Sequence, residues 1–100
     1  QQLAYLLERL KNTSDGFGRN LLDQSMICYG SAISDGNRHN NENLPVVLAG
    51  GGNGTLDTGR HVKVNAETPM CNLFMSMLQR FGTPVDYIGD STGILNELTI

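Results

Sequence analysis

Two short runs of uncharged, mostly apolar residues constrain this chain more than any other feature. The first run spans Ser25–Ile33 and the second spans Val46–Ala49, and polar or turn-forming residues bound both of them. Runs of this kind are typical of β-strands that are buried on both faces, as in a parallel sheet. We therefore expect the two strands to lie side by side inside a sheet, with their carboxyl ends converging on one pocket.

Two further segments have the spacing of amphipathic helices. Leucines recur at i, i+3, i+4 and i+7 within residues 2–11. In the second segment Thr68 suits the N-cap, Pro69 suits the first helical position and Gly82 suits the C-terminal end. The apolar residues between them keep helical spacing: Met70, Leu73, Phe74, Met77, Leu78 and Phe81. Residues 60–64 alternate between polar and apolar side chains, which predicts a short edge strand.

The order of these elements predicts an α/β fold with a mostly parallel sheet. Strands that are buried on both faces need covering helices, and two helices cannot cover such a sheet. We therefore expect residues 1–100 to form a single region, the C-terminal fragment of a larger domain. The remainder of its own parent chain is then the expected partner.

Composition excludes several classes of protein. A hydrophobic content of 39% with only 17% charged residues is unlike a disordered chain. The chain has seven Lys and Arg against ten Asp and Glu, so it has no excess of positive charge with which to bind nucleic acid. No apolar run approaches the roughly 18 residues of a membrane span. Cys28 and Cys71 fit no zinc-ligand spacing and are expected to be free, buried thiols, although a disulfide between them stays open.

A polar loop over residues 34–43 follows the first predicted strand. In open α/β sheets, ligands bind at the carboxyl ends of the strands. Asp35 and His39 are residue types that bind divalent metal ions, and Arg38 could pair with an anionic substrate. The alternative is a loop whose side chains bond to the local backbone. The residues alone favour this alternative, because two ligands fall short of the three or four that a metal site requires.

Three glycine-containing motifs do not support catalysis. Residues 89–93 fit Gly-x-Ser-x-Gly, the nucleophile elbow of α/β-hydrolases, but both histidines precede Ser91 and that chemistry needs one after it. We therefore expect a turn at Ser91. Residues 54–59 have the glycine spacing of a P-loop, but Arg60 and His61 stand where that motif has Lys and Ser or Thr. The glycine run over residues 50–54 fails Gly-x-Gly-x-x-Gly at Thr55 and is interpreted as the exit of the second strand.

Several consecutive segments together resemble the C-terminal part of a secreted bacterial family of unknown function. The segments are Leu21–Asp23, Tyr29–Ser31, Ser34–His39, Leu44–Gly51, Gly59–His61 and Gly89–Leu95. The family is named for a His-x-x-Ser-His-His motif, which is absent from this chain. The resemblance runs from Leu3 to Leu98, and the family is more remotely similar to the alkaline-phosphatase-like superfamily.

This resemblance implies an exported protein, periplasmic or secreted, with an alkaline-phosphatase-like fold. It makes Asp35 and His39 candidate ligands of a divalent metal, most often zinc, and Arg38 a substrate-binding residue. The full-length protein would then be a metal-dependent hydrolase of phosphate or sulfate esters. Gly36 and Asn41 stand where relatives often have histidine. A non-catalytic extracytoplasmic binding or structural domain is therefore the alternative, and whether the protein is an enzyme stays open.

Overall fold

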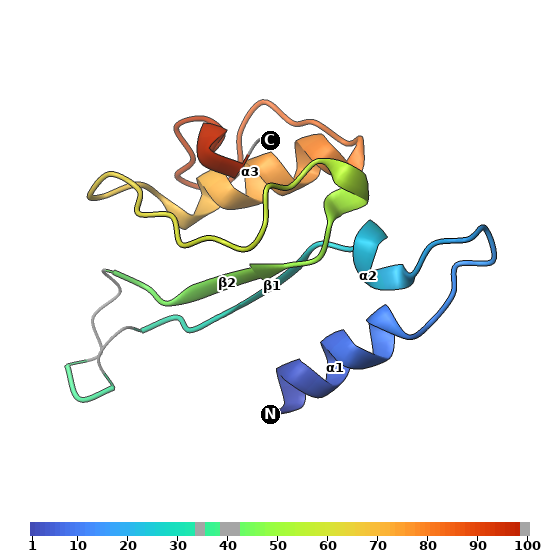
Figure 1. The fold of residues 1–100 in the computed structure, drawn as a ribbon. Coiled ribbons are helices and arrows are strands. Elements are labelled where there is room, and N and C mark those ends of the chain that lie inside the picture. Colours follow the sequence, from blue (N-terminus) through green and yellow to red (C-terminus); the bar gives the residue numbers. More distant parts are fainter. Residues whose placement is uncertain (34–35, 39–42, 99–100) are drawn as a thin grey trace. The chain divides into compact units, whose positions relative to one another are not determined.

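The chain divides into two compact units, Gln1–Gly50 and Gly51–Ile100 (Figure 1). A computed structural model describes residues 1–33, 36–38 and 43–98. The first unit contains the helices α1 (Gln2–Lys11) and α2 (Leu21–Gln24) and the strands β1 (Ile27–Gly30) and β2 (Val46–Ala49). The second unit contains the helix α3 (Met70–Phe81) and two short 3-10 helices, Gly52–Gly54 and Asn96–Leu98.

Helix α1 confirms the prediction from leucine spacing. It spans Gln2–Lys11, and the basic residues Arg9 and Lys11 lie in its last turn, where the helix dipole favours positive charge. No residue of this helix is buried. The leucine stripe is only partly covered in the described chain, because Leu3, Leu7 and Leu10 are half-buried and Leu6 is exposed.

The two strands form an antiparallel pair, so the expected fold class is wrong. Ile27 pairs with Ala49 and Gly30 pairs with Val46 in the only sheet of the described residues. The predicted mostly parallel, alkaline-phosphatase-like sheet is thus contradicted. The physical reason is that a run of apolar residues indicates a strand but carries no information about its direction. Direction depends on the connection, and the described part of residues 31–45 contains no crossover helix.

The strands are also more exposed than predicted. Cys28, Tyr29 and Gly30 of β1 are exposed, and so is Val47 of β2. The expectation of a buried Cys28 is therefore wrong, while both cysteines are free as predicted. An uncharged run predicts a buried strand, but only packed neighbours can bury one.

Helix α3 confirms the second predicted helix, with one change at its start. Pro69 is the N-cap, and the Thr68 hydroxyl donates instead to the Asn65 carbonyl at 2.6 Å. Gly82 ends the helix with a left-handed φ of 91°. The predicted strand at residues 60–64 is absent, because this segment pairs with no other strand among the described residues.

The buried residues of the described chain all belong to the second unit. They are Gly52, Leu56, Asn72, Leu73 and Ser76. Only Leu56 and Leu73 among them are large and apolar. A chain of this length can bury a modest core, but these two side chains make a very small one.

Gly50, which follows β2, is expected to tolerate no side chain. Its φ is 102°, and a Cβ there would collide with the Ser25 carbonyl. Gly54 also has a positive φ of 85°, but a Cβ there would meet nothing within 4 Å. We expect Gly54→Ala to lower the free energy of unfolding by about 1 kcal/mol, the cost of a left-handed residue. Gly50→Ala should cost at least about 1 kcal/mol more, because the backbone must also shift.

Urea unfolding followed by circular dichroism measures this difference. Equal losses for the two variants would show that Gly50 is needed only for its φ and not for the close approach to Ser25.

Candidate functional site

The three predicted site residues belong to the connection between β1 and β2. Arg38 lies in an exposed turn over residues 36–38, whereas Asp35 and His39 lie outside the described residues. Because Gly30 pairs with Val46 and Ile27 with Ala49, the end of β1 and the end of β2 lie at opposite ends of the hairpin. The expected convergence of both strand ends on one pocket is therefore wrong.

The described residues do not themselves assemble a metal site. Within residues 1–33, 36–38 and 43–98, no three His, Cys, Asp or Glu side chains lie together in a group that could hold a metal ion. Arg38 belongs to the same connection of the sequence as Asp35 and His39, which lie outside the described residues.

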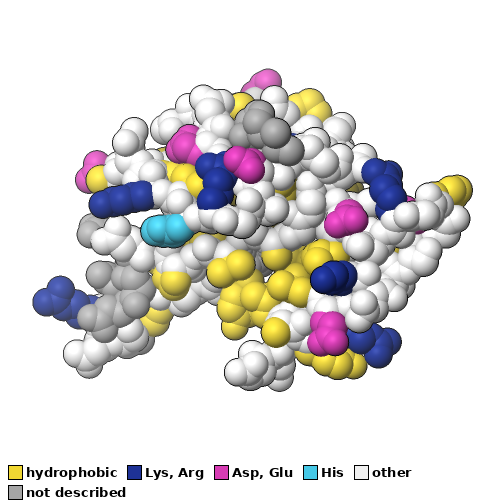
Figure 2. Space-filling model, viewed as in Figure 1, with side chains coloured by type: hydrophobic (Ala, Val, Ile, Leu, Met, Phe, Trp, Pro, Cys, Tyr) yellow, Lys and Arg dark blue, Asp and Glu magenta, His cyan; other side chains and the backbone are white. Residues whose placement is uncertain are grey.

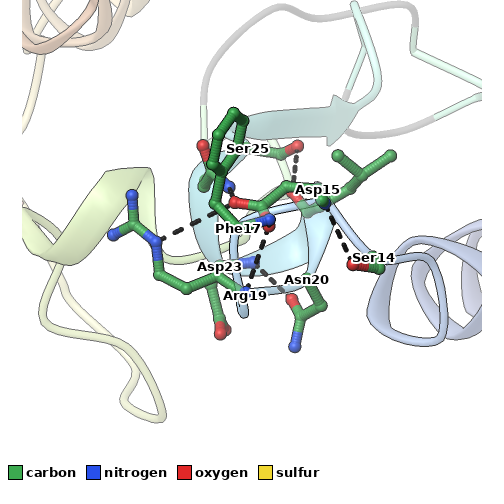
Figure 3. A network of polar contacts seen from close by, with 10 residues as sticks. Ser14, Asp15, Phe17, Arg19, Asn20, Asp23 and Ser25 are labelled. Atoms are coloured by element: carbon green, nitrogen blue, oxygen red, sulfur yellow. Dashed lines mark hydrogen bonds and ion pairs between the residues drawn. The ribbon is translucent and has the colours of Figure 1, made fainter.

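A network of polar contacts in the first unit surrounds Asp15 (Figure 3). One oxygen of its carboxylate accepts hydrogen bonds from the backbone N–H groups of Phe17, at 2.7 Å, and Arg19, at 3.1 Å. The other oxygen accepts from the Gln24 side chain and lies 4.0 Å from the Arg19 guanidinium. These contacts close the loop between α1 and α2. The sequence predicted a loop here from its turn-forming residues but did not identify Asp15 as its centre.

A shallow cavity of about 460 Å³ lies beside this loop. Its lining residues are Lys11, Asn12, Thr13, Ser14, Gly18, Arg19, Asn20 and Asp23. Both cations already have a role in the fold: Arg19 pairs with Asp15, and Lys11 lies in the last turn of α1. The Asn20 side chain caps α2 by accepting from the Asp23 backbone N–H at 2.8 Å. The polar groups of the cavity therefore stabilise the loop, and we assign no ligand to it.

In the second unit, two buried polar side chains of α3 hold the segment over residues 88–95. Asn72 accepts a hydrogen bond from the Thr92 backbone N–H at 2.8 Å and donates one to the Thr92 hydroxyl at 3.1 Å. Ser76, which is fully buried, accepts from the Leu95 backbone N–H at 2.6 Å. Sequence reasoning missed this pair because it followed only apolar positions. Two polar residues four apart inside an apolar helix face were the available signal.

Ser91 lies in a turn, as its sequence context predicted. Its backbone N–H donates to the Ile88 carbonyl at 2.8 Å, and its hydroxyl accepts from the Ile88 backbone N–H at 2.9 Å. The hydroxyl thus closes the turn, and residues 92–95, which follow it, are not helical, whereas a nucleophile elbow leads directly into a helix.

The comparisons with known proteins identified no relative of this chain. No family model, no curated protein and no solved structure matches the chain. The resemblance to the His-x-x-Ser-His-His family stays a prediction. None of the described helices has the length and apolar character needed to cross a membrane.

The Asp15 network should make stability depend on acid pH. The Phe17 backbone N–H holds the pKa of Asp15 below its ordinary value of 3.8, and Arg19 and Gln24 act in the same direction against the effect of burial. A carboxyl whose pKa is lowered by folding contributes stability above its unfolded pKa. That contribution is lost as pH falls through the folded pKa. We therefore expect Asp15→Asn to be less stable near neutral pH and to depend less on pH below about pH 4.

Urea unfolding at a series of pH values measures this effect, with Asp86→Asn, an exposed carboxylate of the second unit, as the matched control. An unchanged acid dependence in Asp15→Asn would contradict the assignment of the network to Asp15.

Proposed function

We propose that this chain is a non-catalytic binding or structural domain whose first unit is covered by further polypeptide. The observation that carries the proposal is that no described residue of Gln1–Gly50 is buried, although this unit contains an amphipathic helix and two uncharged strands. Burial of apolar surface is the dominant favourable contribution to folding, at about 25 cal/mol per Å². A unit with this sequence and without a core of its own needs a partner surface.

The exposed apolar side chains of the first unit lie on both kinds of element. Tyr5 of α1 is 63% exposed, while Tyr29 of β1 and Val47 of β2 are 58% and 50% exposed. Tyr29 and Val47 are direct cross-strand partners, so they lie on the same face of the hairpin, which we call the hairpin face. Figure 2 shows hydrophobic side chains gathered around the hairpin and α1. Contiguous exposed apolar surface of this kind marks interaction sites.

The chemistry of the chain favours protein as the partner. The formal net charge is −3, which disfavours binding to the phosphate backbone of nucleic acid. The charge-free strands instead favour an apolar protein surface, and we propose the remainder of the parent chain as its source. The family resemblance supports a periplasmic or secreted location for that protein.

Replacing the hairpin face with charge tests the proposal. Tyr29→Lys combined with Val47→Lys should lower the free energy of unfolding of the 100-residue chain by about 1 kcal/mol, because both side chains are exposed and the loss is limited to one cross-strand pair and the repulsion between the two lysines. In the parent protein the same pair should cost about 3 kcal/mol or more, because two apolar side chains lose their buried surface.

Tyr87→Lys is the matched control, since Tyr87 is an exposed aromatic residue of the second unit. Denaturant unfolding of each variant in both chains gives the comparison. Equal effects of the hairpin-face pair in the two chains would refute covering of the first unit.

A metal-dependent ester hydrolase is the second candidate, supported by the position of the hairpin connection. Asp35, Arg38 and His39 fall within this one connection of the sequence. A carboxylate oxygen and an imidazole nitrogen suit zinc, and the remaining ligands would come from the parent chain. Bound zinc would polarise the oxygen of a phosphate or sulfate ester. Arg38 would then orient the anionic group of the substrate.

Metal analysis of the parent protein tests this second candidate. Asp35→Ala and His39→Ala should each reduce the zinc content of the purified protein by at least half, because removing one protein ligand weakens the site. His61→Ala is the matched control for the loss of a histidine. Unchanged zinc content in both site variants, or no zinc in the unmodified protein, would refute the proposed metal site.

A further inference from the structure

The segment over residues 88–95, which we call the strap, lies beside α3 and is held there by polar contacts (Figure 1). The Thr92 backbone N–H donates to the Asn72 side chain at 2.8 Å, and the Leu95 backbone N–H donates to the Ser76 hydroxyl at 2.6 Å. The exposed fractions of Asn72 and Ser76 are 6% and 0%. The strap is therefore attached to the helix through two buried polar side chains.

The strap itself has little buried surface. None of its residues is buried, and Ile88, Ser91 and Leu95 are its half-buried residues. Burial of apolar surface is the main favourable contribution to folding. Segments with few buried apolar groups therefore open locally at lower cost than the elements on which they lie. We expect the strap to be held less stably than α3.

Other contacts of the second unit fix the chain on both sides of the strap. Before the strap, the Thr83 backbone N–H donates to the Leu78 carbonyl at 3.0 Å and closes the end of α3. After the strap, the Asp57 backbone N–H donates to the Leu98 carbonyl at 3.2 Å, and the Arg60 guanidinium donates to the carbonyl of the preceding residue. Loss of the contacts to α3 would thus lift the strap between two fixed ends.

The thiol of Cys71, in the first turn of α3, lies against the strap. A Cβ built on Gly89 would come within 3.0 Å of the Cys71 Sγ, which is tighter than an ordinary contact. Cys71 is free and half-buried. A bulky group attached to this Sγ and a docked strap therefore compete for the same space. Whatever attaches to the thiol favours the lifted strap, and whatever stabilises the docked strap protects the thiol.

We propose that the strap lifts from α3 while the helix stays folded, and that this lifting controls the access of thiol-modifying reagents to Cys71. The docked strap is the state that the structure shows. Its exposed residues, its attachment through two side chains and its contact with Cys71 through a glycine carry the proposal. Because the strap and the thiol both belong to the second unit, this device is independent of any covering of the first unit.

Reaction of Cys71 with dithiobis-nitrobenzoate, an aromatic disulfide, measures the lifting. Cys28→Ser leaves Cys71 as the single thiol of the chain. The Cys71 thiolate displaces one aromatic thiolate, so that one S–S bond breaks and a mixed disulfide forms. We expect the folded chain to react at least tenfold more slowly than the same chain in concentrated urea, each relative to free cysteine. Equal relative rates would show that the docked strap does not protect the thiol and would overturn the proposal.

A serine substitution in α3 should weaken the attachment of the strap. In the Cys28→Ser background, Ser76→Ala removes the acceptor of the Leu95 N–H and should accelerate the reaction about fivefold, the factor that one hydrogen bond contributes to an equilibrium constant. Ser14→Ala is the matched control, because the Ser14 hydroxyl also accepts from a backbone N–H but lies in the first unit. An unchanged rate in Ser76→Ala, or an equal increase in both variants, would contradict the proposed attachment.

The urea dependence of the reaction separates lifting of the strap from unfolding of the whole unit. Lifting exposes little surface, so the reaction rate in dilute urea should depend on urea much less steeply than global unfolding followed by circular dichroism. A rate that follows global unfolding at every urea concentration would show that the strap and α3 open together, and the proposal would then be wrong.

Amide hydrogen exchange measured by NMR tests the reverse coupling. When Cys71 carries the mixed disulfide, the amides of Thr92 and Leu95 should exchange at least tenfold faster than in the unmodified chain. The Leu78 amide, inside α3, should keep its rate, and reduction of the mixed disulfide should restore slow exchange in the strap. Unchanged exchange at Thr92 and Leu95 in the modified chain would show that the adduct and the docked strap coexist, which would refute the coupling.

Discussion

The antiparallel register of β1 and β2 determines where every candidate residue of the first unit lies. It places Tyr29 and Val47 on one face, directs the backbone of Cys28 and Gly30 outward, and makes residues 31–45 a single connection. A shift of one residue would exchange the faces and turn the outward groups inward. The positions of these residues therefore depend on four residue pairs, of which Ile27–Ala49 and Tyr29–Val47 are the hydrogen-bonded ones, and each such bond contributes only about 1 kcal/mol.

The two units differ in the polar contacts that order them. In the second unit, the buried side chains of Asn72 and Ser76 in α3 hydrogen-bond to Thr92 and Leu95, so polar groups supply order where Leu56 and Leu73 are the only large apolar side chains buried among the described residues. Such bonds specify one conformation because an unmade bond at a buried site is costly. In the described part of the first unit, the hydrogen bonds of Asp15 order the link between α1 and α2.

Local features of the fold were predictable from the sequence, and long-range ones were not. The leucine spacing predicted α1, and Gly82 together with the apolar spacing predicted α3, because helix formation depends on residues within a few positions of each other. Strand direction depends on how distant segments pair, so the parallel sheet was wrong even though β2 was predicted with its observed bounds. The alternation at residues 60–64 predicted a strand that has no partner to pair with among the described residues.

The residues of the candidate site show the same difference between local features, which were predictable, and long-range features, which were not. The turn at Ser91 was predicted from the absence of a later histidine, which is a property of the sequence alone. The buried pair Asn72 and Ser76 was missed, because their role depends on a segment about twenty residues away in the chain. For Asp35 and His39 the sequence supplies the types of ligand and their spacing. How many ligands come together around a metal ion depends on the three-dimensional fold.

The two proposed functions share one structural requirement, and this requirement shows which of them depends on the other. A metal site built on Asp35 and His39 would need at least one more ligand, and no three His, Cys, Asp or Glu side chains of the described residues form a complete site by themselves. An isolated two-stranded hairpin is at best marginally stable in water, so the hairpin that carries their connection would gain stability from a covering surface. Under both proposals, the packing of additional polypeptide on the first unit would meet these needs. Catalysis at this connection would presuppose that packing, whereas the proposed binding role would not require a metal.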